Sequence, residues 1–141
     1  MTGRAKLIDM FQGLAKKRDV SLWSLKAPEQ GLLLMSFAQT IAPDETFSER
    51  EFSTRLKAWL EGEGDVLRTD FAELRRALVD LRFFERDASG AVYRRAAQWP
   101  ERWRDQCEAV EDVALAELLA RARAMEANQR EARKRLAMAR A

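Results

Sequence analysis

The stretch from Thr46 to Arg95, TFSEREFSTRLKAWLEGEGDVLRTDFAELRRALVDLRFFERDASGAVYRR, decides the fold. It contains two segments with apolar residues at helical spacing, and then two short strand-like runs around a turn. The first segment begins at a capping box, because Ser48 and Glu51 are spaced so that each side chain bonds a backbone N–H of the other. Behind this cap, one helical stripe is formed by Phe52, Leu56, Trp59 and Leu60.

The second helical segment begins at Thr69 or Asp70, where Asp70 and Glu73 repeat the spacing of the first cap. Its apolar residues recur every three or four positions, which is typical of a helix with one buried face. We therefore expect a second short helix directly before the strand-like runs. Its stripe consists of Phe71, Leu74, Leu78 and Leu81.

A β-hairpin is predicted after the second helix. The runs 83–86 and 91–95 flank the turn Asp87-Ala88-Ser89-Gly90, which ends in glycine. Alternation along the second run places Tyr93 on the opposite sheet face from its neighbours. Helix, turn, helix and hairpin is the order of a winged helix, a variant of the helix-turn-helix. The sequence thus predicts a mainly α fold with a small β-hairpin, a winged helix-turn-helix.

The same residues resemble a known family. The run F-S-E-R-E-F, followed by F-A-E-L-R-R-A-L-V-D-L-R-F-F-E-R-D-A-S-G-A-V-Y-R-R, is similar to the winged-helix family named domain of unknown function 2087. The resemblance covers roughly the middle half of the chain and implies a small bacterial winged helix, alone or joined to regulator-type helix-turn-helix domains. It implies no established activity. The chain departs from the family pattern in its longer, glycine-rich loop at 61–68 and in the segment after Arg95.

Three regions are expected along the chain. Residues 1–27 form an N-terminal amphipathic helix over 3–17 and a connector, in which Trp23 buries its ring. Residues 28–98 form the winged-helix domain, whose first helix runs from Pro28 to about Thr40. Residues 99–141 form one long C-terminal helix or two in series, which begins at Trp99-Pro100-Glu101.

The C-terminal region carries two apolar patterns. The first predicts packing on the winged-helix domain and the second is a heptad register, rich in alanine and interrupted by Gln129. The region is therefore either a C-terminal helix with a basic end or a dimerisation arm. The first pattern consists of Trp103, Cys107, Val110, Ala114 and Leu118, and the second of Leu115, Leu118, Ala122, Met125, Gln129, Ala132, Leu136 and Ala139.

The formal net charge of +2 hides an uneven distribution. Residues 1–27 carry 6 basic and 2 acidic side chains, residues 28–98 carry 10 and 13, and residues 128–141 carry 5 and 1. A domain that attracts nucleic acid by bulk charge would be basic. Here the positive charge gathers at the two ends of the chain instead, and the loop Glu61–Asp65 between the two helices is acidic and flexible.

Composition excludes several kinds of site. The chain has no histidine and a single cysteine, Cys107, so the commonest general base and the usual zinc-ligand sets are absent. No glycine-rich phosphate loop and no G-x-S-x-G motif occurs. Cys107 lies on an apolar stripe, as a small buried hydrophobe does. We therefore expect no catalytic residues, no cofactor and no metal, and a protein that is not an enzyme.

No apolar run approaches the roughly 20 residues that a membrane span needs. The start, MTGRAKLIDMF, lacks the features of a signal peptide, and one cysteine fits a reducing compartment. These features predict a cytoplasmic bacterial protein without a membrane partner.

Eight residues are candidates for contact with nucleic acid. Helix-turn-helix proteins read bases with the outer face and N-terminal end of the second helix, and arginine on a wing suits phosphate or the minor groove. The residues at the helix entrance could also bind a phosphate together with the backbone donors there. The candidates are Arg68, Thr69, Arg75, Arg76 and Arg82 on the second helix or at its ends, and Arg86, Arg94 and Arg95 on the hairpin.

Each group of candidates has a structural alternative. Arg75 and Arg76 could serve salt bridges and helix packing, and Arg76 is spaced to pair with Asp80. The hairpin arginines could keep a short edge strand soluble. The favoured hypothesis is a bacterial transcription regulator that binds double-stranded DNA as a dimer. The alternative is a non-enzymatic module that uses the same fold and its C-terminal helix to contact a protein partner.

Overall fold

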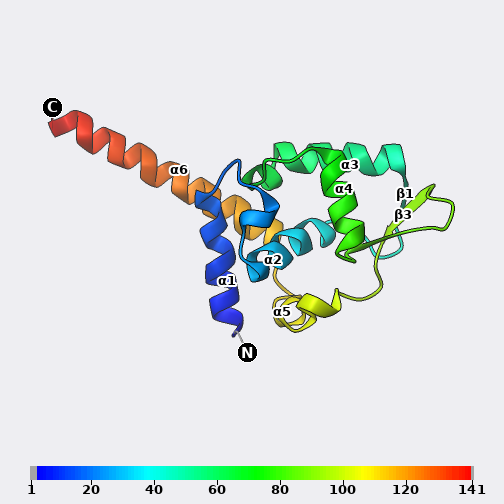
Figure 1. The fold of residues 1–141 in the computed structure, drawn as a ribbon. Helices are drawn as coiled ribbons and strands as arrows, with labels where there is room; N and C mark the ends of the chain where they lie inside the picture. Colours follow the sequence, from blue (N-terminus) through cyan, green and yellow to red (C-terminus); the bar gives the residue numbers. More distant parts are fainter. Residues whose placement is uncertain (1–2, 141) are drawn as a thin grey trace.

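Helix α2 (Ala27–Ala38) runs through the middle of the fold, and the computed structural model describes the chain from residue 3 to residue 140 (Figure 1). Every residue of α2 from Glu29 to Ala38 is buried, as expected of a helix that is apolar on all sides. Pro28 lies in its first turn, where a missing N–H costs no hydrogen bond. The predicted helix from Pro28 to about Thr40 is therefore confirmed within two residues at each end.

The central stretch folds in the predicted order of helix, helix and hairpin. Helices α3 (Glu49–Glu61) and α4 (Phe71–Asp80) are followed by strands β2 (Phe84–Arg86) and β3 (Val92–Arg95), which pair antiparallel. A further strand, β1 (Thr46–Ser48), pairs with β3, so that the sheet order is β1-β3-β2. The mainly helical class with a small antiparallel sheet is thus confirmed, and the sheet has one more strand than predicted.

Both helices begin at their predicted caps, with both hydrogen bonds of the capping box at Ser48 and one of the two at Asp70 among residues 3–140. The Ser48 hydroxyl accepts from the Glu51 N–H at 3.1 Å, and the Glu51 carboxylate accepts from the Ser48 N–H at 2.8 Å. This backbone hydrogen bond lowers the pKa of Glu51. At α4, the Asp70 carboxylate accepts from the Glu73 N–H at 2.7 Å. The two caps fix where α3 and α4 begin.

The N-terminal region comprises α1 (Arg4–Gln12), a 3₁₀ turn η1 (Gly13–Lys16) and a second 3₁₀ turn η2 (Leu22–Ser24). The expected burial of Trp23 is wrong, because its side chain is 56% exposed. Ser21 caps η2 by accepting from the Trp23 N–H. This tight turn directs Leu22 and Leu25 into the core and leaves the indole outside.

The C-terminal region forms two α-helices in series after a 3₁₀ turn η4 (Glu101–Trp103): α5 (Arg104–Ala109) and α6 (Leu115–Arg140). The break over residues 110–114 changes the phase of the apolar stripe. Ala114 is exposed and Leu118 only half-buried, contrary to expectation, whereas Leu115 and Leu119 are buried. The far end of α6 projects away from the body, at the opposite end of the molecule from the hairpin (Figure 1).

The acidic loop between α3 and α4 is held in place. Its 3₁₀ turn η3 (Glu63–Val66) buries Gly64 and Val66, and Asp65 accepts from both Arg18 and Arg123. Arg123, on α6, also donates to the carbonyl of Ala15 at 2.7 Å. One carboxylate therefore ties the N-terminal segment, the interhelical loop and α6 together. The loop presents less free negative charge than its sequence indicates, because two guanidinium groups neutralise Asp65.

Candidate nucleic-acid interface

Helix α4 and the hairpin line a shallow depression of about 200 Å³. Arg76 enters it from α4 and Arg86 from β2, with Tyr93 beside them. Arg86 is the partner of Tyr93 in the strand register, so both side chains lie on one sheet face. The Arg86 guanidinium carbon lies 5.7 Å from the centroid of the Tyr93 ring. The fold thus brings a helix arginine and a hairpin arginine, both predicted candidates, to one place.

The hairpin turn is ordered by its own side chains. The Asp87 carboxylate accepts from the N–H groups of Ala91, at 2.9 Å, and Val92, at 3.1 Å. The bond from Val92 is the main cause of the lowered pKa of Asp87. Gly90 has a φ of 75°, a left-handed conformation that glycine adopts without strain. Its carbonyl accepts from Arg86 at 3.2 Å, so the turn also positions the arginine in the depression.

Two of the eight candidates form ion pairs with side chains of residues 3–140. Arg75 donates to the Ser53 hydroxyl at 2.8 Å and lies 2.9 Å from the Glu49 carboxylate, which ties α4 to α3. Arg94 lies 3.2 Å from Glu85, its partner in the register, on the sheet face opposite Tyr93. The ion pair of Arg75 corresponds to the helix-packing role, the structural alternative to DNA binding.

Three candidates lie at the ends of α4. At the N-terminus of α4, Arg68 is exposed and Thr69 is half-buried. The Glu73 N–H there already donates to the Asp70 carboxylate, so it is not free to bind a phosphate. Arg82 follows the helix, is exposed, and has a φ of 69°, unusual for a residue other than glycine. Arg68 and Arg82 are therefore exposed at opposite ends of the helix, and Arg76 lies between them.

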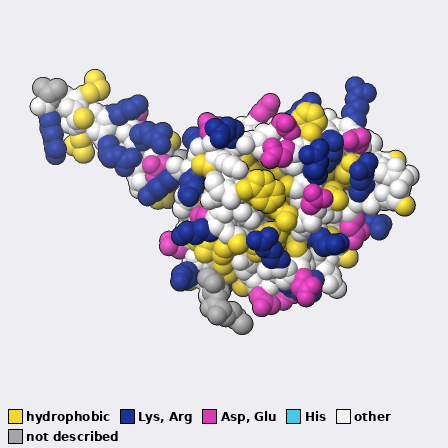
Figure 2. All heavy atoms as spheres, in the orientation of Figure 1, with side chains coloured by type: hydrophobic (Ala, Val, Ile, Leu, Met, Phe, Trp, Pro, Cys, Tyr) yellow, Lys and Arg dark blue, Asp and Glu magenta, His cyan; other side chains and the backbone are white. Residues whose placement is uncertain are grey.

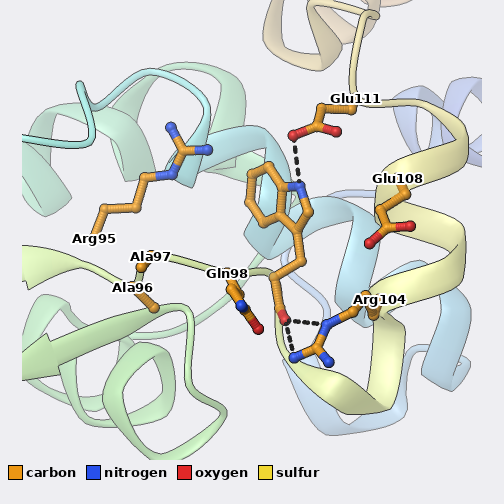
Figure 3. Close-up of a pocket in the computed structure, with 8 residues that line it drawn as sticks. Arg95, Ala96, Ala97, Gln98, Arg104, Glu108 and Glu111 are labelled. Atoms are coloured by element: carbon orange, nitrogen blue, oxygen red, sulfur yellow. Dashed lines mark hydrogen bonds between the residues drawn. The ribbon is translucent and has the colours of Figure 1, made fainter.

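Arg95 points away from the α4 depression and into a separate cleft of about 550 Å³ (Figure 3). Its guanidinium carbon lies 4.6 Å from the centroid of the Trp99 ring, and it donates to the Ile41 carbonyl at 3.1 Å. Burial lowers the pKa of Arg95, and the charge of Glu111 acts against that shift. No pattern in the sequence predicted this cleft, since it joins the end of β3 to residues of α5 and the turn after it.

The surface around the α4 depression is mixed in sign. Arg75, Arg76 and Arg86 line the depression together with Glu49 and Asp80. Figure 2 shows basic and acidic side chains interspersed over the body on the face it displays, and several lysines and arginines on the projecting part of α6. Any affinity for phosphate at this site therefore depends on a few individual arginines and not on a continuous basic surface.

The described residues offer little for other chemistry. Cys107 is fully buried, and burial raises its pKa to about 12, so the reactive thiolate is scarce near neutral pH. Over residues 3–140 no group of acidic or cysteine side chains has the geometry of a metal site. Within the same range, no helix has both the length and the apolar character needed to cross a bilayer.

The sequence profile of one bacterial family matches residues 15–95, which begin in η1 and end at the last residue of β3. The chain belongs to this family, domain of unknown function 2087, described as an uncharacterized protein conserved in bacteria. The family region contains the sheet, α2, α3 and α4, whereas α5 and α6 lie beyond it. No curated protein and no solved structure matches the chain.

Proposed function

We propose that the chain is a DNA-binding protein of winged-helix type, which places α4 and its hairpin on duplex DNA as a transcription regulator does. The observation that carries this proposal is the convergence of Arg76, from α4, and Arg86, from β2, on one depression. Winged-helix and related proteins contact DNA with these two elements. Arginine from both suits phosphate contacts that fix the orientation of the protein on the duplex.

The proposal is also supported by arginines on this face whose side chains have no partner among residues 3–140. Over residues 3–140, the side chains of Arg68, Arg76 and Arg82 make no hydrogen bond and no ion pair within the chain. They are exposed along α4 and at its ends, where a phosphate backbone would pass. Arg75, Arg94 and Arg95 have partners elsewhere and would contribute to structure more than to DNA binding.

The test is fluorescence-anisotropy titration of random-sequence duplex DNA at several salt concentrations. We expect binding that weakens linearly with the logarithm of salt. The variant Arg76→Ala/Arg86→Ala should bind about tenfold more weakly, and its salt slope should fall by about 1 for each phosphate that the variant no longer neutralises. Circular dichroism checks that the variant is folded.

The matched control is Arg133→Ala/Arg135→Ala, which removes the same charge from the projecting part of α6. If the proposal is correct, this control binds DNA nearly as well as the wild type. If DNA affinity falls only in Arg133→Ala/Arg135→Ala, the DNA contact lies on the projecting part of α6 and not on α4 and the hairpin. The absence of binding even at low salt would leave the protein-interaction module, the second hypothesis, as the function to pursue.

A separate observation favours self-association through α6. Every described residue of α6 from 127 onward is exposed. A helical segment as short as 127–140 is only marginally stable in water when it packs against nothing. The heptad repeat that starts at the buried Leu115 continues along the exposed arm to Ala139, with one polar interruption at Gln129. We propose that two copies pair through this repeat.

Antiparallel pairing fits the arm better than parallel pairing. A groove of about 520 Å³ lies at the base of the arm, between η1 and α6, and is lined in part by Ala15, Leu118 and Met125. In a two-fold pair, the tip of each arm reaches the base of the other, so Leu136 can enter this groove.

Sedimentation equilibrium tests the pairing. The wild type should form dimers, and Leu136→Glu should weaken the dimer by about tenfold or more, because it places a charge in the apolar repeat. Met138→Glu is the matched control, since Met138 is exposed on the same turn region but outside the repeat. A monomeric wild type at all concentrations, or equal effects of both substitutions, would contradict pairing through the repeat.

A further inference from the structure

The cleft beside Arg95 has the features of a ligand site. It is formed by the last residue of β3, the linker 96–99 and the first residues of the C-terminal region, and it measures about 550 Å³. This volume lies in the range of small-molecule sites in proteins. Its walls carry both signs of charge: Arg95 and Arg104 are basic, and Glu108 and Glu111 are acidic.

The opposite charges face each other across the cleft without pairing. Figure 3 shows Arg95 on one side and Glu108 and Glu111 on the other. Among residues 3–140, neither glutamate forms an ion pair, and the Glu108 carboxylate accepts no hydrogen bond. Arg104 is occupied by the Trp99 carbonyl, to which its Nε and Nη2 donate at 3.2 and 3.0 Å. The cleft therefore has an anion-binding side and a cation-binding side, each with unused capacity.

Trp99 determines how far apart the two sides are. Its ring lies against the Arg95 guanidinium, at 4.6 Å from the ring centroid, while its Nε1 donates to Glu111 at 3.2 Å. The indole is held at 8% exposure by these contacts. Because the ring stands between Arg95 and Glu111, one small group cannot bond both. A ligand that joins them carries its amine and its carboxylate at opposite ends.

We propose that this cleft binds a short zwitterion whose amine and carboxylate are separated by an aliphatic chain. The carboxylate pairs with Arg95, the ammonium with Glu108 and Glu111, and the aliphatic chain spans the distance between them. A ligand with one charge alone would form only one of the two ion pairs. The site adjoins the last residue of the hairpin. A bound zwitterion would therefore fix the position of Arg95, which also donates to the Ile41 carbonyl before β1.

Isothermal titration calorimetry without DNA tests the site independently of the proposed DNA binding. The probe is δ-aminovalerate, and its single-charge analogues are valerate and pentylamine. We expect δ-aminovalerate to bind one per chain, and both analogues to bind at least about tenfold more weakly, which corresponds to about 1.4 kcal/mol. No measurable binding of δ-aminovalerate, or equal binding of either analogue, would overturn the proposal.

Glu108→Gln identifies the cleft as the place of binding. Glu108 is exposed and its carboxylate accepts no hydrogen bond from residues 3–140, so this variant should fold normally and bind the probe about tenfold more weakly. Glu101→Gln is the matched control, because Glu101 is exposed on the neighbouring turn and does not line the cleft. It should retain wild-type affinity. Equal affinity of Glu108→Gln and wild type would also refute the assignment.

Discussion

Replacing Phe52 with alanine should lower the free energy of unfolding by about 3–5 kcal/mol, the range for truncation of a buried phenylalanine. Phe52 is fully buried on α3 and is the centre of an aromatic cluster. Its ring centroid lies 4.8 Å from that of Phe84 and 5.2 Å from that of Tyr93, so it contacts both strands of the hairpin. It also lies 5.7 Å from Phe47 on β1 and 6.2 Å from Phe37 on α2.

This destabilisation should appear as a lower urea midpoint with an unchanged dependence on urea concentration. Phe71→Ala is the matched control, since Phe71 begins α4, is only half-buried, and carries Lys57 over its ring at 4.3 Å. It should cost about 1 kcal/mol. If Phe52→Ala is too unstable to purify, Phe52→Leu should show a smaller effect in the same direction. A destabilisation by Phe52→Ala no larger than that by Phe71→Ala would mean that α3 does not hold the sheet.

The parts of the fold that were predictable carry strong local signals. Ser48 and Glu51 bond each other's backbone as their spacing indicates, and Tyr93 is buried between two exposed neighbours as alternation requires. Strand β1 could not be predicted in the same way. It is three residues long and is defined by pairing with β3, which lies far along the chain beyond α3 and α4, so no periodicity within the segment reveals it.

The candidate site was harder to predict than the fold. Residue type marks an arginine as a possible phosphate ligand, but only the tertiary structure decides its partners. Arg76 makes no hydrogen bond and no ion pair with residues 3–140, whereas Arg75, the residue before it, donates to Ser53 and pairs with Glu49. Arg94 and Arg95 likewise diverge to opposite faces, because successive residues of a strand alternate. The cleft beside Arg95 depends on Glu108 and Glu111, which the fold brings to β3 from beyond the family region.

Gly31→Ala should destabilise the protein, although helix propensity alone predicts the opposite. Gly31 lies inside α2, where alanine is favoured over glycine by about 1 kcal/mol. A Cβ atom at this position would lie 2.5 Å from two atoms of the Trp103 ring and 2.8 Å from the Gln106 amide nitrogen. Overpacking of a well-filled core costs about 1–3 kcal/mol, and this cost should exceed the propensity gain, so we expect a net destabilisation of up to about 2 kcal/mol in urea unfolding.

The clash cannot be relieved by a small movement of the indole. Trp103 donates from Nε1 to the Ala27 carbonyl at 2.8 Å, and its ring is stacked on Phe83 with centroids 5.6 Å apart. Gly13→Ala is the matched control, because Gly13 has a helical φ of −60° and a Cβ there meets nothing within 4 Å. That substitution should stabilise the protein by about 0.4–1 kcal/mol, mainly through the unfolded state. Opposite signs for the two substitutions would place Trp103 firmly against α2, whereas stabilisation by both would mean that the C-terminal region does not pack on α2 in this way.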